Sequence, residues 1–421
     1  MAGAGAVVTA HLAHRAVSET VTALRSQVVH QWRSADHLAA EARLRLARRY
    51  RDQYGRLDDE FANLRASWSW LTTQTSKEAA HLLLAYLDAL TPYLRQRGLH
   101  AELLRWCEVG LQACEKLQKN PGRLLLLRSE AQNALGRWDG AAASIQAAIE
   151  ASKGKDPGTY ARAVLALGRL QKNQGNYREA LETLSKAERL LSEQSDYEGV
   201  AVVRSEMAGE YLNRGEWDKA LSLYRSVDRL RKQAGATETS DHTLLMLGVV
   251  HRKKREYEQA ISYLQRLLER SERRHNQGAT ATAAHHLAWV YLNQGDLAQA
   301  QRLCGRAIAL YEESGDTRGT SDAYEQLGLI ACAEGRGEEA LSHLKRSLAI
   351  RRQLGNQHGV ASSLRRLAVV HLKMGHPLTG ARELWQSLAL YRRLGVLSYQ
   401  QFIAILRELC DWIMGRRQWT I

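Results

Sequence analysis

The strongest constraint on the fold is an internal repeat with a period of 40 residues. In each copy, a turn residue is followed five positions later by a small residue. The clearest copies occupy residues 173–180, 213–220, 253–260, 293–300, 333–340 and 373–380. Two weaker copies precede them, with turns at Gly136 and Gly98. A unit this short cannot bury an apolar face alone, so the copies must stack on their neighbours into an array.

Each unit has the pattern of two helices joined by a turn. The turn residue is Gly in five of the six clear copies and Arg255 in the third. Glycine ends a helix in the left-handed conformation without steric cost. Small residues seven positions before the turn and five after it would let the two helices approach closely. They are Gly168, Ala208, Gly248, Ala288, Gly328 and Ala368 before the turns, and Ala180, Ala220, Ala260, Ala300, Ala340 and Gly380 after them. The aromatic residue after the turn is expected to pack back over the pair, as at Trp138, Tyr177, Trp217 and Tyr257.

The repeat therefore predicts an all-α, right-handed solenoid of about eight helix-turn-helix units over residues 79–394. The first helices are expected near 79–97, 122–135, 157–174, 197–214, 237–254, 277–294, 317–334 and 357–374. The second helices are expected near 100–118, 138–152, 177–193, 217–232, 257–273, 297–313, 337–353 and 377–394. Residues 1–78 do not follow the repeat and form a separate N-terminal segment, with helices expected near 6–32, 35–54 and 57–74. Residues 395–421 are expected to hold a capping helix, near 398–414, and a tail.

The pattern Leu-Gly/Ala-x-x-Tyr-x-x-x-Gly-x-Tyr/Trp-x-x-Ala resembles the tetratricopeptide repeat. The mid-helix aromatic position is filled by Tyr211 and Tyr291, whereas Gln171, His251, Ala331 and His371 depart from the pattern. The usual repeat has about 34 residues. The longer unit of this chain resembles the repeats of kinesin light chain, of Pins-type spindle adaptors and of bacterial regulators. The resemblance implies the fold but no particular ligand.

A second resemblance lies before the repeats, in residues 57–71. Its matching residues are Glu60, Asn63, Leu64, Arg65, Ala66 and Trp70. They resemble the helix at which the repeat sensor begins in bacterial signal-transduction ATPases of the STAND class, which include many transcription regulators. In those proteins an ATPase precedes this helix. The chain contains no Gly-x-x-x-x-Gly-Lys-Ser/Thr loop, so the resemblance implies the sensor part alone or a stand-alone relative.

No catalytic, cofactor-binding or metal-binding constellation stands out. His285 and His286 are adjacent, and adjacent helical side chains diverge too far to chelate one ion. Cys107 and Cys114 have no second pair to complete a zinc site, so we interpret them as core residues. Five scattered cysteines favour a reducing cytoplasm, and no apolar stretch is long enough to span a membrane. We expect no enzyme, no cofactor and no metal.

The expected binding surface is the concave side, lined by the first helices. Asn173, Asn213 and Asn293 each stand two residues before a turn, and Lys253 and Lys373 replace asparagine in two copies. In similar repeat proteins, an asparagine at this place grips the backbone of an extended peptide, and its amide can both donate and accept. The alternative is that it ends the helix by local bonding. The other candidates are Arg169, Arg252, His285, Trp289 and Arg365.

The chain carries a formal net charge of +14. This charge indicates an acidic partner or nucleic acid, or else simply a basic surface spread around the superhelix. The sequence favours a protein- or peptide-binding scaffold that acts as a sensor or adaptor in a regulatory assembly. The alternative is a nucleic-acid-associated protein that binds phosphates through its arginines. The sequence does not indicate an oligomeric state.

Overall fold

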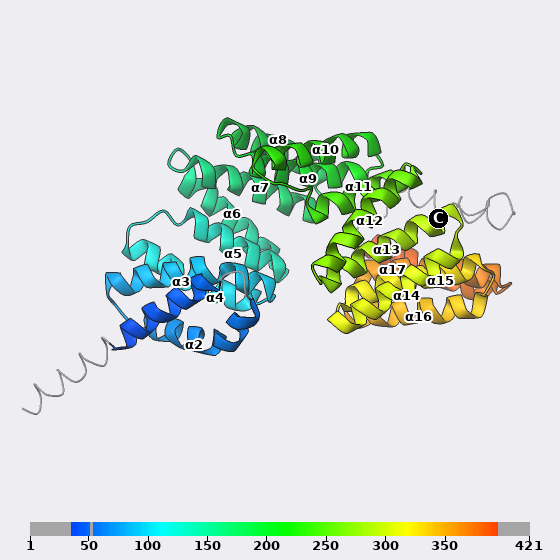
Figure 1. The fold of residues 1–421 in the computed structure, drawn as a ribbon, viewed down its shortest axis with the longest axis horizontal. Helices are drawn as coiled ribbons and strands as arrows, with labels where there is room; N and C mark the ends of the chain where they lie inside the picture. Colours follow the sequence, from blue (N-terminus) through cyan, green and yellow to red (C-terminus); the bar gives the residue numbers. More distant parts are fainter. Residues whose placement is uncertain (1–34, 51–53, 395–421) are drawn as a thin grey trace, which may run out of the picture. The chain divides into compact units, whose positions relative to one another are not determined.

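A computed structural model of the protein describes residues 35–50 and 54–394. Every regular element in this part of the chain is an α-helix (Figure 1). The chain divides into two compact units, Met1–Val203 and Arg204–Ile421. The predicted helices at 6–32 and 398–414 lie outside the described residues. The predicted domain boundaries at 78 and 394 stay predictions.

Unit 1 begins with a helical segment at 35–49. Its further helices are α2 (Tyr54–Thr72), α3 (Lys77–Gln96), α4 (His100–Lys116), α5 (Gly122–Ala134), α6 (Trp138–Ser152), α7 (Pro157–Asn173) and α8 (Tyr177–Glu193). From α3 to α8, each helix packs against the next one in the chain, alternately within a pair and between pairs. Helix α9 (Tyr197–Asn213) spans the boundary between the units.

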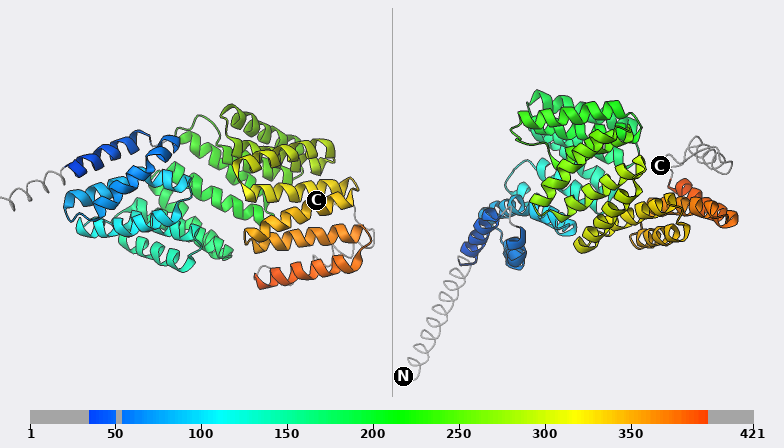
Figure 2. Two further views of the ribbon diagram at one scale, coloured as in Figure 1. Left: turned by 90° about the horizontal axis from the view of Figure 1, so that it is seen from below. Right: turned by 45° about the vertical axis from the view of Figure 1, so that its right-hand side comes forward.

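Unit 2 continues the same alternation. Its helices are α10 (Trp217–Gln233), α11 (Asp241–Lys253), α12 (Tyr257–Arg273), α13 (Gln277–Gln294), α14 (Leu297–Ser314), α15 (Thr317–Ala333), α16 (Gly337–Gln353), α17 (Gln357–Lys373) and α18 (Pro377–Arg393). Figure 2 shows the last of these pairs, in yellow to orange, stacked side by side. The all-α helix-pair architecture predicted from the 40-residue period is confirmed.

The small residues of the repeat allow the two helices of a pair to touch. A Cβ atom added to Gly248 would lie 2.6 Å from Cγ of Leu264, and one added to Gly328 would lie 2.7 Å from Cγ of Leu344. The alanines at the equivalent place, such as Ala288, are fully buried. The small residues thus set the spacing within each pair, as the sequence predicts.

The aromatic residues after the turns cover their helix pairs less than expected. Trp138, Tyr177 and Trp217 are 42 %, 49 % and 39 % exposed. The prediction that they pack back over the pair is therefore only partly right. Each ring begins its helix, where one edge stays open to solvent.

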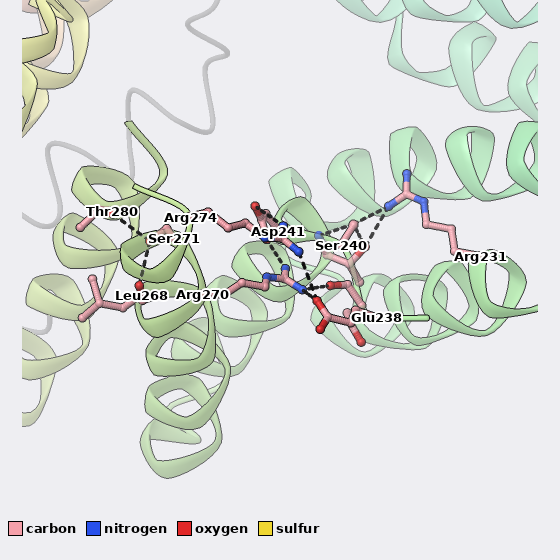
Figure 3. A network of polar contacts seen from close by, with 11 residues as sticks. Arg231, Glu238, Ser240, Asp241, Leu268, Arg270, Ser271, Arg274 and Thr280 are labelled. Carbon is pink, nitrogen blue, oxygen red and sulfur yellow. Dashed lines mark hydrogen bonds and ion pairs between the residues drawn. The ribbon is translucent and has the colours of Figure 1, made fainter. Parts of the chain in front are cut away.

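The connector before α11 departs most from the sequence prediction. The helix expected from residue 237 begins at Asp241, because the side chain of Ser240 accepts a hydrogen bond from the backbone N–H of Thr243 and caps the helix. Figure 3 shows the guanidinium of Arg270, from α12, among the connector residues. Arg270 donates to the carbonyl of Thr239 at 2.6 Å and pairs with Asp241. These bonds hold residues 238–240 outside the helix.

Two residues of the N-terminal motif, Leu64 and Arg65, attach α2 to the rest of unit 1. Leu64 is fully buried, and Asn63 donates to Glu60 at 3.0 Å within α2. Arg65 reaches across to Glu102 of α4, with Nε–Oε1 at 2.8 Å. The ion pair fastens α2 to α4, the second helix of the first predicted pair.

Candidate functional site

The first helices of neighbouring pairs contact one another. This holds for α5 with α7 in unit 1, and for α11, α13, α15 and α17 in succession in unit 2. Among the described residues, no two second helices of neighbouring pairs make a comparable contact. The first helices therefore form the inner layer of each unit, where successive pairs converge. Every predicted site residue lies on a first helix.

In unit 2, three predicted residues meet on α11 and α13. The guanidinium of Arg252 lies 5.6 Å from the ring centroid of Trp289, a cation–π contact. The indole Nε1 of Trp289 donates to Nε2 of His285 at 3.2 Å, one helical turn away. The structure thus joins Arg252, Trp289 and His285 into one cluster, which we call the inner cluster.

Several polar atoms of this inner face are buried without a partner. Among the described residues, no hydrogen-bond partner lies within reach of Nε of Arg252, Nδ1 of His285 or Oδ1 of Asn293. Leaving such groups unpaired costs roughly 1–3 kcal/mol each. A group that brings its own donors and acceptors would recover this energy. The buried, unpaired oxygen of Asn293 also argues against a helix-ending bond to that oxygen.

The protonation of His285 follows from its surroundings. The side chain is only 9 % exposed. Burial lowers its pKa to about 4, Asp322 opposes this shift, and the charge of Arg252 adds to it. The ring is therefore neutral at pH 7. Because Nε2 accepts from Trp289, the proton lies on Nδ1, so His285 offers an unpaired N–H donor.

Lys253 extends the cluster toward α17. Its side chain is exposed, yet its pKa is lowered, first by desolvation and then by the charges of Arg252 and Arg366. Among the described residues, no carboxylate lies within ion-pairing distance of Lys253 or Arg252. Lys253 and Arg252 are thus neighbouring cations on α11 without an ion-pair partner among the described residues.

Two carboxylates on α15, Asp322 and Glu325, pair with arginines of the two following helices. Arg351 of α16 is only 6 % exposed and pairs with both Glu325 and Asp322. It also donates to Oγ of Ser363 on α17 at 2.9 Å. Glu325 lies 3.7 Å from Nε of Arg366. One buried arginine therefore joins three helices, α15, α16 and α17.

The structure does not bring all the predicted residues together. Arg365 lies on α17, but the contact with Glu325 is made by its neighbour Arg366, which the prediction omitted. The only signal in the sequence was the Arg365-Arg366 pair itself. Asn213 ends α9 with an exposed side chain, and Asn173 ends α7 in the same way.

Unit 1 has a groove of its own, of about 530 Å³, along α5, α7 and α9. The predicted residue Arg169 lines it. Asn133, which the prediction missed, also lines it and has a buried, unpaired Oδ1. Asn133 stands 40 residues before Asn173, a spacing that could have revealed it. The ion pairs of this groove include Arg95 with Glu130 and Arg162 with Asp196.

The part of the chain that the structure describes gives little support for a metal site, a reactive thiol or a membrane span. No group of three or more His, Cys, Asp or Glu side chains there could hold a metal ion. Cys107 and Cys114 are buried free thiols, as predicted, and burial raises the pKa of Cys107 to about 12. None of the described helices combines the length and the apolar character that a membrane span requires.

The comparisons with known proteins agree with this geometry. A family model described as a tetratricopeptide repeat matches residues 240–313 and 319–393, and a second model of the same description matches residues 161–190. The chain contains tetratricopeptide repeats. The repeats matched by the first model carry the inner cluster. A comparison with curated proteins found no match in sequence.

Solved structures share the fold of these tetratricopeptide repeats. The apo form of the quorum sensor NprR from B. thuringiensis has 16 % identity and a TM-score of 0.57, over 81 % of this chain and 97 % of that one. The STAND protein with a tetratricopeptide repeat sensor from Pyrococcus horikoshii has 16 % identity and a TM-score of 0.55, over 82 % of this chain and 54 % of that one. The apo form of RapI has 12 % identity and a TM-score of 0.55, over 65 % of this chain and 98 % of that one. At these identities the likeness concerns the fold alone.

Proposed function

We propose that the protein is a non-enzymatic scaffold that binds a protein or peptide segment on the inner face of unit 2. The observation that carries this proposal is the set of buried, unpaired polar atoms on Arg252, His285 and Asn293. An extended peptide presents both carbonyl acceptors and N–H donors along its backbone. It therefore matches the two donors, Arg252 and His285, and the acceptor, Asn293.

The wider role we propose is that of a sensor or adaptor in a regulatory assembly. The fold that the chain shares with a quorum sensor and with a STAND protein carrying a repeat sensor supports this role. In a stack where each pair touches only its neighbours, a ligand that spans several pairs favours one curvature over another. We expect the binding event to take place in the cytoplasm.

Nucleic-acid binding explains the net positive charge less well than peptide binding does. Many arginines of the basic runs are already paired within the chain, among them Arg270, Arg274 and Arg351. The inner face also carries two carboxylates, Asp322 and Glu325, which would repel a chain of phosphates.

A peptide library displayed on phage and selected on the full chain would test the proposal. The synthetic peptide that is enriched should bind the Asn213→Ala, Asn293→Ala double variant at least about tenfold more weakly than the wild type, a loss of about 1.4 kcal/mol. The matched control is Gln259→Ala with Gln265→Ala, two exposed positions on α12, which should bind as the wild type does. Unchanged affinity in the asparagine variant would show that the inner face is not the site.

A further inference from the structure

The bond between Trp289 and His285 exists only while the imidazole carries no proton at Nε2. The indole nitrogen donates to this atom at 3.2 Å, and an indole N–H can donate but not accept. A proton on Nε2 would therefore set two N–H groups against each other. The other ring nitrogen, Nδ1, is buried and has no hydrogen-bond partner among the described residues. A charged His285 would thus leave both of its N–H groups unsatisfied in this position.

The groups packed around His285 do not favour a positive charge there. The ring of His286, on the same helix, meets it edge-on with centroids 5.4 Å apart, and the ring of Tyr311 from α14 lies 6.4 Å away. Burial lowers the pKa of His286 and raises that of Tyr311, so both rings are uncharged. From α11, Arg252 places a cation over the indole that His285 holds. Asp322 of α15 favours the charged imidazole, but it is already paired with a guanidinium of α16 at 2.6 Å.

We propose that His285 is a pH-operated latch for Trp289, in which protonation of the imidazole breaks the bond between them and releases the indole from the inner cluster. At neutral pH the latch holds the indole against α13, one helical turn from His285. In acid the indole is free to leave this position, so the inner face exists in two states whose balance is set by one proton. The inference goes beyond the proposed function, because the latch operates without any bound partner.

Acid favours the released state because the two states bind the proton differently. Burial, the largest cause, lowers the pKa of the latched His285 to about 4, whereas a ring that leaves the cluster regains the ordinary pKa of about 6.5. Between these two values the released state holds more protons than the latched state. The ratio of released to latched molecules should consequently rise about tenfold for each pH unit from about 6.5 down to 4, and stay constant above this range.

Fluorine NMR of the full chain labelled with 5-fluorotryptophan tests the latch without a ligand. The chain has ten tryptophans, and Trp289→Phe identifies the resonance of interest by its loss. As the pH falls from 7 to 4, this resonance should move to a new position. The resonance of Trp217, which is 39 % exposed at the start of α10, is identified in the same way and should stay in place. Circular dichroism of the same samples should show an unchanged helix content.

Two substitutions of His285 separate the latch from a general effect of acid. His285→Gln keeps an acceptor but takes up no proton, so the Trp289 resonance should stay at its neutral-pH position down to pH 4. His285→Leu removes the acceptor, so at pH 7 the resonance should already lie where the wild type brings it in acid. The matched control is His371→Gln, at another buried histidine, which pairs with Glu383 of α18. In this control the Trp289 resonance should titrate as it does in the wild type.

Two results would overturn the latch. If the Trp289 resonance moved in His285→Gln as it does in the wild type, acid would act at another group. If His285→Leu left the resonance at its wild-type position at pH 7, the bond to His285 would not hold the indole, and this comparison needs no acid at all. Neither result bears on the proposed function, which is judged by the binding of the selected peptide. A working latch in a chain that binds no peptide would in turn leave this inference intact.

Discussion

The indole Nε1 of Trp289 donates to Nε2 of His285 at 3.2 Å. This bond requires an imidazole that is unprotonated at Nε2, so the inner face is arranged around a neutral histidine. Burial, which is the largest cause, lowers the pKa of His285 to about 4, whereas an unfolded histidine has a pKa of about 6.5. The unfolded chain therefore binds this proton at a higher pH than the folded chain does.

The stability of unit 2 should consequently fall as the pH drops from about 6.5 toward 4. The sign follows from linkage, since in this interval the unfolded state holds more protons than the folded state. Between pH 7 and pH 5, His285 should account for a loss of about 2 kcal/mol in the free energy of unfolding. His285→Gln should remove this part of the pH dependence in urea unfolding. An equal loss in the variant and the wild type would contradict the assignment.

The connector before α11 depends on one buried arginine. Arg270→Met should lower the free energy of unfolding by roughly 2–3 kcal/mol, because Asp241 and the carbonyl of Thr239 lose their charged partner. Arg274 contacts both carboxylates with which Arg270 pairs, Glu238 and Asp241, but its side chain is 57 % exposed. Arg274→Met should therefore cost less than about 1 kcal/mol. Urea unfolding of both variants measures the difference, and equal losses would refute this ranking.

In the turn between α11 and α12, a residue with a Cβ atom occupies a left-handed backbone conformation that favours glycine. Arg255 has a φ of +61°, where the next repeat has Gly295 at +87°. A left-handed conformation costs a residue with a Cβ about 1–2 kcal/mol, and glycine gives back part of this in chain entropy. Arg255→Gly should thus raise the free energy of unfolding by about 0.5–1 kcal/mol. The same substitution inside α12, Arg266→Gly, should lower it by about 1 kcal/mol.

The close approach within a pair can be tested with two glycines of unit 2. Gly328→Val should destabilise the protein by about 1–3 kcal/mol, because the new atoms meet Leu344 and the backbone oxygen of Ala340. Gly305 on α14 has no neighbour within 4 Å of an added Cβ. Gly305→Ala should accordingly stabilise by about 0.5–1 kcal/mol through helix propensity. If the midpoint of thermal unfolding shifted in the same direction in both variants, close packing at Gly328 would not be the cause.

The sequence predicts the helices better than it predicts the site. The expected helix 277–294 coincides with α13, because a 40-residue period repeats the same turn chemistry in every copy. The start of α11 was missed by four residues, because it depends on Arg270, which comes from a later helix. Arg252, His285, Trp289 and Asn293 were recognisable from their place in the repeat. Arg366 and Arg351 were not, since their roles come from charges that only the stacking of α15, α16 and α17 brings together.

The central claim is that the inner face of the first helices binds the partner. Photo-crosslinking with benzoylphenylalanine placed at Trp289 on α13, and in a second variant at Arg266 on α12, tests it most directly, with the peptide enriched by phage selection as the probe. The account predicts a crosslinked adduct from the position of Trp289 and none from the position of Arg266. An adduct from Arg266 alone would place the ligand on the second helices and contradict the account.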